Sequence, residues 1–283
     1  MKNKKVLVLL GGTSDERAVS LDSGRACVKA LKKKGYKVST FDPKKKSLNL
    51  IDRDKTDIIF NALHGKDGED GVAQSYFECL RIPYTHSGVI SSYKAMNKMI
   101  SKEIFKQYKI KSPSYFVLKK DNYNKVKLNK ILKRKRINFP VVIKPTSEGS
   151  SIGVRICHNI INLKKFSRLL FKRYSELMIE TYIGGQEIQV AVLNKAALGA
   201  IELKPKRKFY DYKAKYTKSA KTKHIMPANL EKNNYYKVLK IAKKAHDILG
   251  CKGITRSDFK FFKNKFYLLE TNTQPGMTSL SLV

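Results

Sequence analysis

The first 63 residues follow a strand–helix–strand rhythm, and this rhythm constrains the fold more than any other feature. The apolar run at 6–10 is typical of a buried parallel strand and ends in a pair of glycines. A helical pattern follows over 19–34, and strand-like runs occupy 36–41 and 57–63. Strands that alternate with helices predict a parallel sheet. We therefore expect a small, open parallel α/β domain over residues 1–95.

Beyond this domain the strands follow one another more directly, and the fold class changes to α+β. Further helices are predicted at 94–108, 163–173 and 235–249, with a basic helix between the first two strands. Further strands are predicted at 115–118, 141–144, 154–156, 177–180, 187–193, 198–203, 257–262 and 265–270. The pair Gly184-Gly185 separates two groups of these elements. We expect two units there, 96–183 and 184–283.

The loop after the predicted strand 141–144 has the composition of an anion-binding loop. It matches neither the Walker pattern nor the dinucleotide GxGxxG pattern. Backbone N–H groups near Gly149 and Gly153 could bind phosphate, and an ordinary hairpin explains the same residues. Lys144 favours phosphate, because a lysine at the end of an apolar strand needs an anionic partner or must extend to water.

Three oxygen-bearing side chains, those of Asp258, Glu270 and Asn272, belong to the last two predicted strands. Glu270 and Asn272 share one face of their strand, because side chains alternate with period two. If that strand pairs with the one carrying Asp258, the three groups converge. A few hard oxygen ligands, completed by phosphate, suit Mg²⁺. The alternative is an exposed polar face of the sheet.

Two further groups of residues add to this picture: one could bind a carboxylate, and the other could form a lid. Arg256 and the glycine-bearing loop 274–283 could hold a carboxylate or a developing oxyanion, although a structural ion pair is an equally simple interpretation. The stretch 209–216 crowds tyrosines, lysines and an aspartate, as in an active-site lid or a surface turn. Phosphate, magnesium and a carboxylate together suggest a carboxylate activated by ATP.

The composition is strongly basic: 59 Lys and Arg against 23 Asp and Glu give a formal net charge of +36. Clustered basic charge is typical of nucleic-acid binding. Here most basic residues are lysines, they are spread from end to end, and their short runs lack flanking aromatics for stacking. We prefer a lysine-rich solvated surface and expect no nucleic-acid partner.

The four cysteines lie far apart in the sequence and form no CxxC pair, which argues against a cysteine-rich zinc site. They are typical of reduced thiols in a cytosolic protein. No apolar run approaches the about 20 residues of a membrane-spanning helix.

Five segments together resemble the D-alanine–D-alanine ligases of the ATP-grasp superfamily. They are residues 10–21, 62–71, 142–153, 209–216 and 268–279, in the family's order. The resemblance covers almost the whole chain and implies the ATP-grasp fold. It implies that ATP drives the joining of two D-alanines, through a D-alanyl phosphate, for peptidoglycan precursor synthesis. It also implies a homodimer in the bacterial cytoplasm, with no membrane partner.

The resemblance assigns a role to individual residues. ATP would lie between the second and third units, in contact with Lys98, Lys144, Glu148, Ser151, Glu180, Tyr182, Ile183, Glu187, Phe209 and Lys215. Two Mg²⁺ ions, or Mn²⁺ in their place, would be held by Asp258, Glu270 and Asn272. The D-alanines and the oxyanion would be bound by Glu16, His64, Arg256, Gly276, Ser281 and Leu282.

In the family a hydrogen-bonded triad holds the lid shut, and here it would consist of Glu16, Ser150 and Tyr216. Relatives that form D-alanyl-D-lactate typically carry phenylalanine at the position of Tyr216, so the tyrosine favours the dipeptide. Family members usually continue for one more helix beyond the position of Val283. We therefore expect a chain without that helix, in which the loop at Ser281 is less well supported.

Three alternatives to the dipeptide ligase stay open on the sequence. The nearest is a D-alanine–D-lactate ligase. An inactive, shortened scaffold would explain where the chain stops. A nucleic-acid-binding protein would explain the charge, but it would leave the predicted metal ligands without a role.

Overall fold

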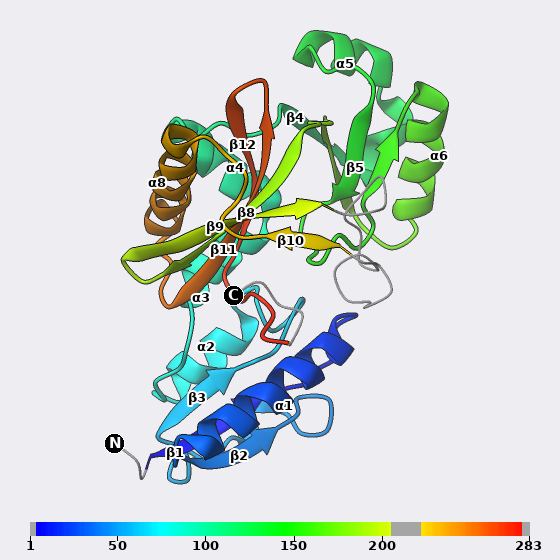
Figure 1. Ribbon diagram of the computed structural model, residues 1–283. Coiled ribbons are helices and arrows are strands. Elements are labelled where there is room, and N and C mark those ends of the chain that lie inside the picture. Colours follow the sequence, from blue (N-terminus) through cyan, green and yellow to red (C-terminus); the bar gives the residue numbers. More distant parts are fainter. Residues whose placement is uncertain (1–3, 205–221, 279–283) are drawn as a thin grey trace.

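The computed structural model describes residues 4–204 and 222–278, which form three β-sheets surrounded by helices (Figure 1). We call them the N-terminal, central and C-terminal sheets, in chain order. No helix in the described ranges is both long and apolar enough to span a membrane.

The N-terminal sheet is parallel, with strand order β2-β1-β3, as the opening rhythm predicts. Its elements are β1 (Lys5–Leu9), α1 (Arg17–Lys33), β2 (Lys37–Phe41), η1 (Leu48–Leu50), β3 (Ile58–Asn61) and α2 (Val72–Cys79). Side chains of β1 alternate between two cores: Val6 and Val8 pack toward α1, while Leu7 and Leu9 pack with Phe77 of α2. The sheet is therefore covered on both faces, as a parallel sheet requires.

The central sheet is antiparallel, with strand order β4-β7-β5-β6. Its elements are β4 (Tyr115–Lys119), η2 (Lys120–Lys125), α5 (Leu128–Lys135), β5 (Val141–Pro145), β6 (Arg155–Cys157), α6 (Ile160–Leu170) and β7 (Glu176–Thr181). Both α5 and α6 pack on one face, against Ile143 and Ile179. The side chains that alternate with these residues, among them Lys144 and Glu180, point to the other face.

The C-terminal sheet is antiparallel, with strand order β10-β9-β8-β11-β12. Its elements are β8 (Gln186–Leu193), β9 (Ala196–Lys204), β10 (Lys223–Ile225), α8 (Lys232–Ile248), β11 (Ile254–Phe262) and β12 (Lys265–Asn272). One core combines Val238 and Ala242 of α8 with Val190 and Phe259 of the sheet. Phe105, which precedes the central sheet in the chain, belongs to the same core.

The helix predicted over 94–108 is two helices, α3 (Val89–Met96) and α4 (Lys98–Gln107). The chain turns at Asn97, whose backbone is extended and whose side chain accepts hydrogen bonds from the N–H groups of Met99 and Ile100. Asn97 thereby caps α4, which is a common use of asparagine. The single-helix prediction was wrong because apolar spacing continues across the cap.

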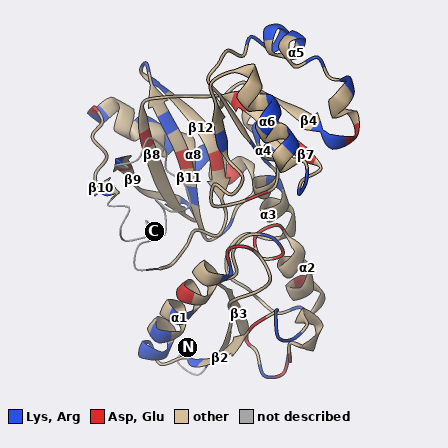
Figure 2. Ribbon diagram, turned by 90° about the vertical axis from the view of Figure 1, so that its right-hand side faces the viewer, with Lys and Arg blue, Asp and Glu red and all other residues tan. Residues whose placement is uncertain are grey.

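Basic residues occur on elements around all three sheets (Figure 2). The described structure thus agrees with a charge that is distributed along the chain rather than collected on one element.

Candidate active site

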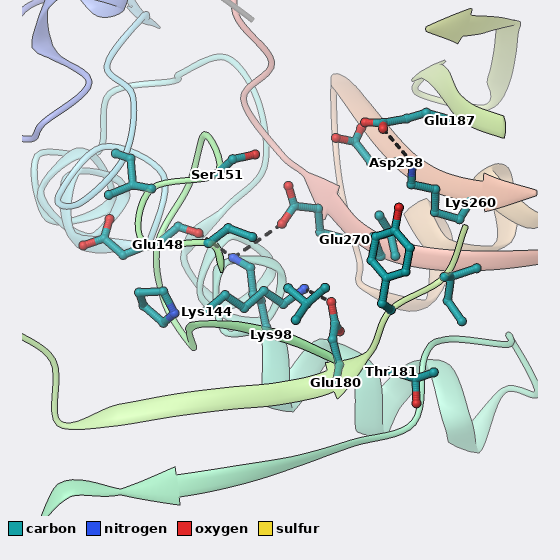
Figure 3. Close-up of a pocket in the computed structure, with 17 residues that line it drawn as sticks. Lys98, Lys144, Glu148, Ser151, Glu180, Thr181, Glu187, Asp258, Lys260 and Glu270 are labelled. Carbon is teal, nitrogen blue, oxygen red and sulfur yellow. Dashed lines mark hydrogen bonds and ion pairs between the residues drawn. The ribbon is translucent and has the colours of Figure 1, made fainter. Parts of the chain in front are cut away.

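A cavity of about 770 Å³, part of it open to solvent, lies between the central and C-terminal sheets (Figure 3). Its lining includes, from the sequence prediction, Lys98, Lys144, Glu148, Ser151, Glu180, Tyr182, Ile183, Glu187, Asp258 and Glu270. Of the described residues expected at the nucleotide or the metal, all but Asn272 line this one cavity. Phe209 and Lys215, also expected at the nucleotide, lie outside the described residues. A volume of this size is in the range of small-molecule sites.

Lys98 lies at the start of α4 and is almost fully buried. Its backbone N–H donates to the carbonyl of Thr146 over 2.9 Å, which joins the helix start to the loop after β5. Its Nζ donates to the backbone carbonyl of Glu148 and lies 3.4 Å from Oε2 of Glu270. One ammonium therefore contacts both the anion-binding loop and the strand β12.

The loop after β5 covers one side of the cavity. Ser150 and Ser151 both have positive φ, of 49° and 61°, in the left-handed region that non-glycine residues rarely adopt. Burial raises the pKa of the Glu148 carboxyl above its ordinary value. A loop with strained backbone at its tip is typical of a ligand-covering segment.

Glu180, on β7, is buried between two lysines. Its Oε1 accepts a hydrogen bond from Lys144, and its Oε2 lies 3.1 Å from Nζ of Lys102. Burial alone would raise the pKa of Glu180, but the charges of Lys102 and Lys144 outweigh burial and lower it. For Lys102, burial is the largest effect and lowers its pKa to about 8.

The far wall of the cavity comes from the C-terminal sheet and the connection to it. Tyr182 and Ile183 follow β7, and Glu187 on β8 forms an ion pair of 2.9 Å with Lys260 on β11. Backbone polar groups beside an apolar wall suit a nucleotide base, and a carboxylate suits the hydroxyl groups of a ribose.

The predicted metal ligands lie at one place on β11 and β12. Asp258 faces Glu270 in the register, and a bulge follows, because Phe259 pairs with Leu268 and so skips Leu269. Leu268 belongs to the core, so regular alternation would turn Glu270 toward the core as well. The bulge lets Glu270 face the cavity, which is a known use of bulges beside active sites.

These oxygens fit a hard cation. Among the described residues no three His, Cys, Asp or Glu side chains come together as a metal group. The expected set instead has two carboxylates and the amide oxygen of Asn272, which accepts from the N–H of Gln274 over 2.7 Å. Two carboxylates at the wall of a cavity that lysines also line leave further positions for phosphate oxygens, and such a ligand set is the one that Mg²⁺ prefers.

Arg256 forms a two-point ion pair with Asp258, with Nε–Oδ1 and Nη2–Oδ2 distances of 2.8 and 3.0 Å. The ion pair that the sequence left open is therefore present in the described structure, and the proposed role of Arg256 toward a carboxylate or oxyanion stays a prediction. Arg256 also lines a smaller cavity of about 460 Å³ with Ser150 and Asn272. This second cavity shares Lys98, Glu148 and Glu270 with the first, so the two adjoin.

The N-terminal sheet contributes Glu16, at the start of α1. Glu16 is buried, and its Oε2 accepts a hydrogen bond from the hydroxyl of Ser150. A Cβ at Gly149 would lie 2.5 Å from Oε1 of Glu16, so glycine allows this close approach. The predicted contact between Glu16 and Ser150 is present, while Tyr216 lies outside the described residues.

His64 follows β3 and is buried with both ring nitrogens occupied. Nδ1 lies 3.0 Å from Oε1 of Glu69, and Nε2 lies 3.1 Å from the hydroxyl of Ser23. The same hydroxyl accepts from the N–H of Met277 over 3.1 Å, next to Gly276. The loop after β12 thus lies against α1. The positions of Ser281 and Leu282 fall beyond the described ranges.

Sequence reasoning missed Lys102, Lys260 and Glu69, which pair with Glu180, Glu187 and His64. One signal was available for Lys102: it stands four residues after Lys98, on the apolar side of α4 with Phe105. Glu180 and Glu187 lie more than 70 positions from their lysine partners, so spacing carries no signal for those two pairs, whereas Glu69 follows His64 by five residues.

Comparisons with known proteins agree with this geometry. A family model described as D-ala D-ala ligase C-terminus matches residues 104–283. A protein of Pelagibacter ubique named D-alanine–D-alanine ligase is 57% identical over 281 residues, covering 99% of this chain and 91% of that protein.

Solved structures are similar over the same extent. The D-alanine–D-alanine ligase of Bacillus anthracis has a TM-score of 0.87 and 34% identity, covering 99% of this chain and 90% of that one. The structure of that enzyme complexed with ATP has a TM-score of 0.84 and 31% identity, covering 99% and 89%. These similarities confirm the expected fold class.

Proposed function

The chain belongs to the D-alanine–D-alanine ligase family, and we propose that it joins two D-alanine molecules into D-alanyl-D-alanine in a reaction driven by ATP. The product would serve peptidoglycan precursor synthesis. The observation that carries this proposal is the cavity between the central and C-terminal sheets, which combines buried lysines, a covering loop and paired carboxylates. The division into units 1–95, 96–183 and 184–283 remains part of the proposal.

In this proposal ATP occupies that cavity with its base beside Glu180, Tyr182 and Ile183, and its ribose beside Glu187. Lys98 and Lys144 bind phosphates, because they are the ammonium groups that line the cavity beside the loop 146–153. Lys215 and Phe209 belong to the same assignment by resemblance.

A carboxylate is a poor acyl donor, so the first D-alanine accepts the γ-phosphoryl group and becomes an acyl phosphate. The phosphoryl group carries negative charge throughout the transfer, and positioning with electrostatic stabilisation does most of the catalysis. Asp258, Glu270 and Asn272 would hold two Mg²⁺ ions, or Mn²⁺. When bound, these ions neutralise phosphate charge.

The second D-alanine then attacks the acyl carbon through its neutral amine, and the C–O bond to phosphate breaks, so that inorganic phosphate leaves as the amide bond forms. The tetrahedral intermediate carries a negative oxygen, which Arg256 and the backbone of Gly276 would stabilise. Arg256 lines the smaller cavity, next to the phosphate site. Glu16 would bind the ammonium of the first D-alanine near His64, and Ser281 with Leu282 would bind the carboxylate of the second.

An acyl phosphate reacts with water, so the site must be closed during the reaction. The hydrogen bond from Ser150 to Glu16 ties the loop after β5 to the N-terminal sheet, and this supports its role as a cover. Tyr216 would complete the triad. By resemblance the protein is a homodimer of the bacterial cytoplasm.

A coupled assay of ADP release tests the function. We expect turnover with D-alanine, none with L-alanine, and no gain when D-lactate is added as acceptor. Turnover that requires D-lactate would assign the chain to the depsipeptide ligases. Absence of D-alanine-dependent ADP release at neutral pH and saturating Mg²⁺ would remove the proposal.

A further inference from the structure

We propose that Lys102 is a positioning residue for the nucleotide: it is the countercharge that stays with Glu180, and it allows Lys144 to leave Glu180 for the phosphates. This inference rests on the proposed function. It concerns a lysine that lies behind the wall of the cavity rather than in its lining.

The position of Lys102 follows from the helix that carries it. Lys98 and Lys102 are one turn apart on the buried side of α4, and their residues are 6% and 1% exposed. Lys98 reaches the cavity, whereas the side chain of Lys102 is fully buried beneath Glu180. The ring of Tyr115 also lies near Lys102, whose Nζ is 5.7 Å from the ring centroid.

The ammonium of Lys102 forms an ion pair with one carboxylate, that of Glu180. Its Nζ lies 3.1 Å from Oε2 of Glu180, but neither atom makes a hydrogen bond to another described residue. The contact is therefore an ion pair rather than a geometrically satisfied hydrogen bond. Oε2 of Glu180 keeps acceptor capacity, because each carboxylate oxygen carries two lone pairs.

The same carboxylate binds the lysine that the proposed function assigns to phosphate. Lys144 donates to Oε1 of Glu180, and both residues line the cavity (Figure 3). If Glu180 and Lys144 were alone, turning Lys144 toward a phosphate would leave a buried carboxylate without a partner. Such an unpaired buried charge is strongly unfavourable.

Lys102, as a second lysine beside Glu180, removes this penalty. The cluster of Lys102, Glu180 and Lys144 has one carboxylate and two ammonium groups, so Glu180 stays paired when Lys144 moves to the nucleotide. Lys102 cannot replace Lys144 at the phosphates, because it is fully buried behind Glu180. We therefore expect its effect on ATP to pass through Glu180.

Substituting Lys102→Met removes the charge and keeps the length of the side chain. Lys144 is then held by Glu180, so the phosphate-dependent part of nucleotide affinity is lost. We expect the dissociation constant of Mg·ATP to rise about tenfold or more, as for the loss of a charge-assisted contact. Adenosine, which has no phosphates, is expected to bind the variant as it binds the unsubstituted chain.

Isothermal titration with Mg·ATP and with adenosine separates these effects, and thermal unfolding checks the fold. Lys106→Met is the matched control, because Lys106 is exposed one turn further along the same helix. Lys102→Gln serves as a second uncharged variant if the methionine variant fails to fold, with the same expected loss. In Lys102→Met combined with Glu180→Gln, Lys144 has no carboxylate to hold it, so the affinity ratio of ATP to adenosine recovers.

The outcomes are distinct. A wild-type chain that does not bind Mg·ATP contradicts the proposed function. A wild-type chain that binds it, with an unchanged ratio of ATP to adenosine affinity in both Lys102 variants, contradicts the role of Lys102 alone. Equal losses for ATP and adenosine also contradict it, since they indicate a merely structural residue.

Discussion

Asn61 and Gln274 share a buried hydrogen bond of 3.0 Å, although 213 positions separate them. Asn61 ends β3 of the N-terminal sheet, and Gln274 follows β12 of the C-terminal sheet. Gln274 also donates to the carbonyl of Leu63. The side chain of Gln274 thus fixes the loop that carries Gly276 to the strand end that precedes His64.

Replacing this side chain should loosen that loop. For Gln274→Ala we expect a loss of about 1–3 kcal/mol of unfolding free energy, because buried partners are left unsatisfied, together with a higher KM for D-alanine. Urea denaturation and steady-state kinetics measure the two effects. In a double-mutant cycle with Asn61→Ala the losses should be less than additive; fully additive losses would contradict a direct contact.

The hydrogen bond between Ser150 and Glu16 should control closure of the cover. In Ser150→Ala we expect kcat with D-alanine to fall about 100-fold, while ADP release without dipeptide formation increases, because water reaches the acyl phosphate. Gly149→Ala should act similarly, since its Cβ would lie 2.5 Å from Oε1 of Glu16. Comparing ADP with dipeptide yield checks this; a constant ratio of one would argue against a water-excluding role.

The adjacent glycines between the sheets offer a matched pair. A Cβ at Gly185 would lie 2.2 Å from the backbone oxygen of Phe261, and φ there is +80°. We expect Gly185→Ala to cost about 2 kcal/mol or more of unfolding free energy. At Gly184 a Cβ meets nothing within 4 Å, so Gly184→Ala should be near neutral. Urea denaturation of both variants decides it, and equal stabilities would overturn the expectation.

The loop between β1 and α1 is held by Asp42, which gives a prediction about pH. The hydrogen-bonded guanidinium of Arg17 lowers the pKa of Asp42 from 3.8 to about 2. A lowered pKa in the folded state means stability that is present above about pH 4 and is lost as the pH falls toward 2. Asp42→Asn should therefore be less stable than the unsubstituted chain at neutral pH.

The difference between the two chains should shrink as the pH falls through that window. Urea denaturation at several pH values between about 7 and 3 measures it. Asparagine keeps the oxygen that accepts from the N–H of Gly12, but it loses the charge together with the second oxygen that accepts from Nη2 of Arg17. A difference that stays constant over the whole range would show that the ion pair does not stabilise the fold.

The bulge turns Glu270 to the cavity, and we propose it as a metal ligand, so Glu270→Gln should lose at least about 100-fold in kcat with the fold intact. Its neighbour Lys98, 3.4 Å away, would keep the anion-binding side of the site. Circular dichroism and kinetics at saturating Mg²⁺ measure the two properties. Glu231→Gln, on the exposed start of α8, is the control. Near-normal turnover of Glu270→Gln would refute its assignment.

Most elements were predictable from the sequence, since apolar periodicity reports burial directly. The strand expected at 57–63 is β3, and the helix expected at 235–249 is α8, each within a few residues. Features made by one or two residues were not predictable. Asn97 separates two helices although the apolar pattern continues across it. The bulge at Leu269 is not marked by any residue type that differs from an ordinary strand.

The site was only partly predictable for a similar reason. Lys144, Glu180 and Asp258 stand out because charged residues on apolar strands need an explanation. In contrast, Lys102 and Lys260, the ion-pair partners of Glu180 and Glu187, looked ordinary in a chain with 59 basic residues. Partner choice depends on packing between elements distant in the sequence, and no local pattern encodes it.

Four carboxylates that line the main cavity each have a cation beside them: Glu180 has Lys102 and Lys144, Glu187 has Lys260, Asp258 has Arg256 and Glu270 has Lys98. The metal ions and the nucleotide that we propose would bring charges of both signs into this cavity. Each of them could take the place of one partner in an ion pair that is already there. We therefore expect binding to rearrange existing ion pairs rather than to introduce unpaired charge.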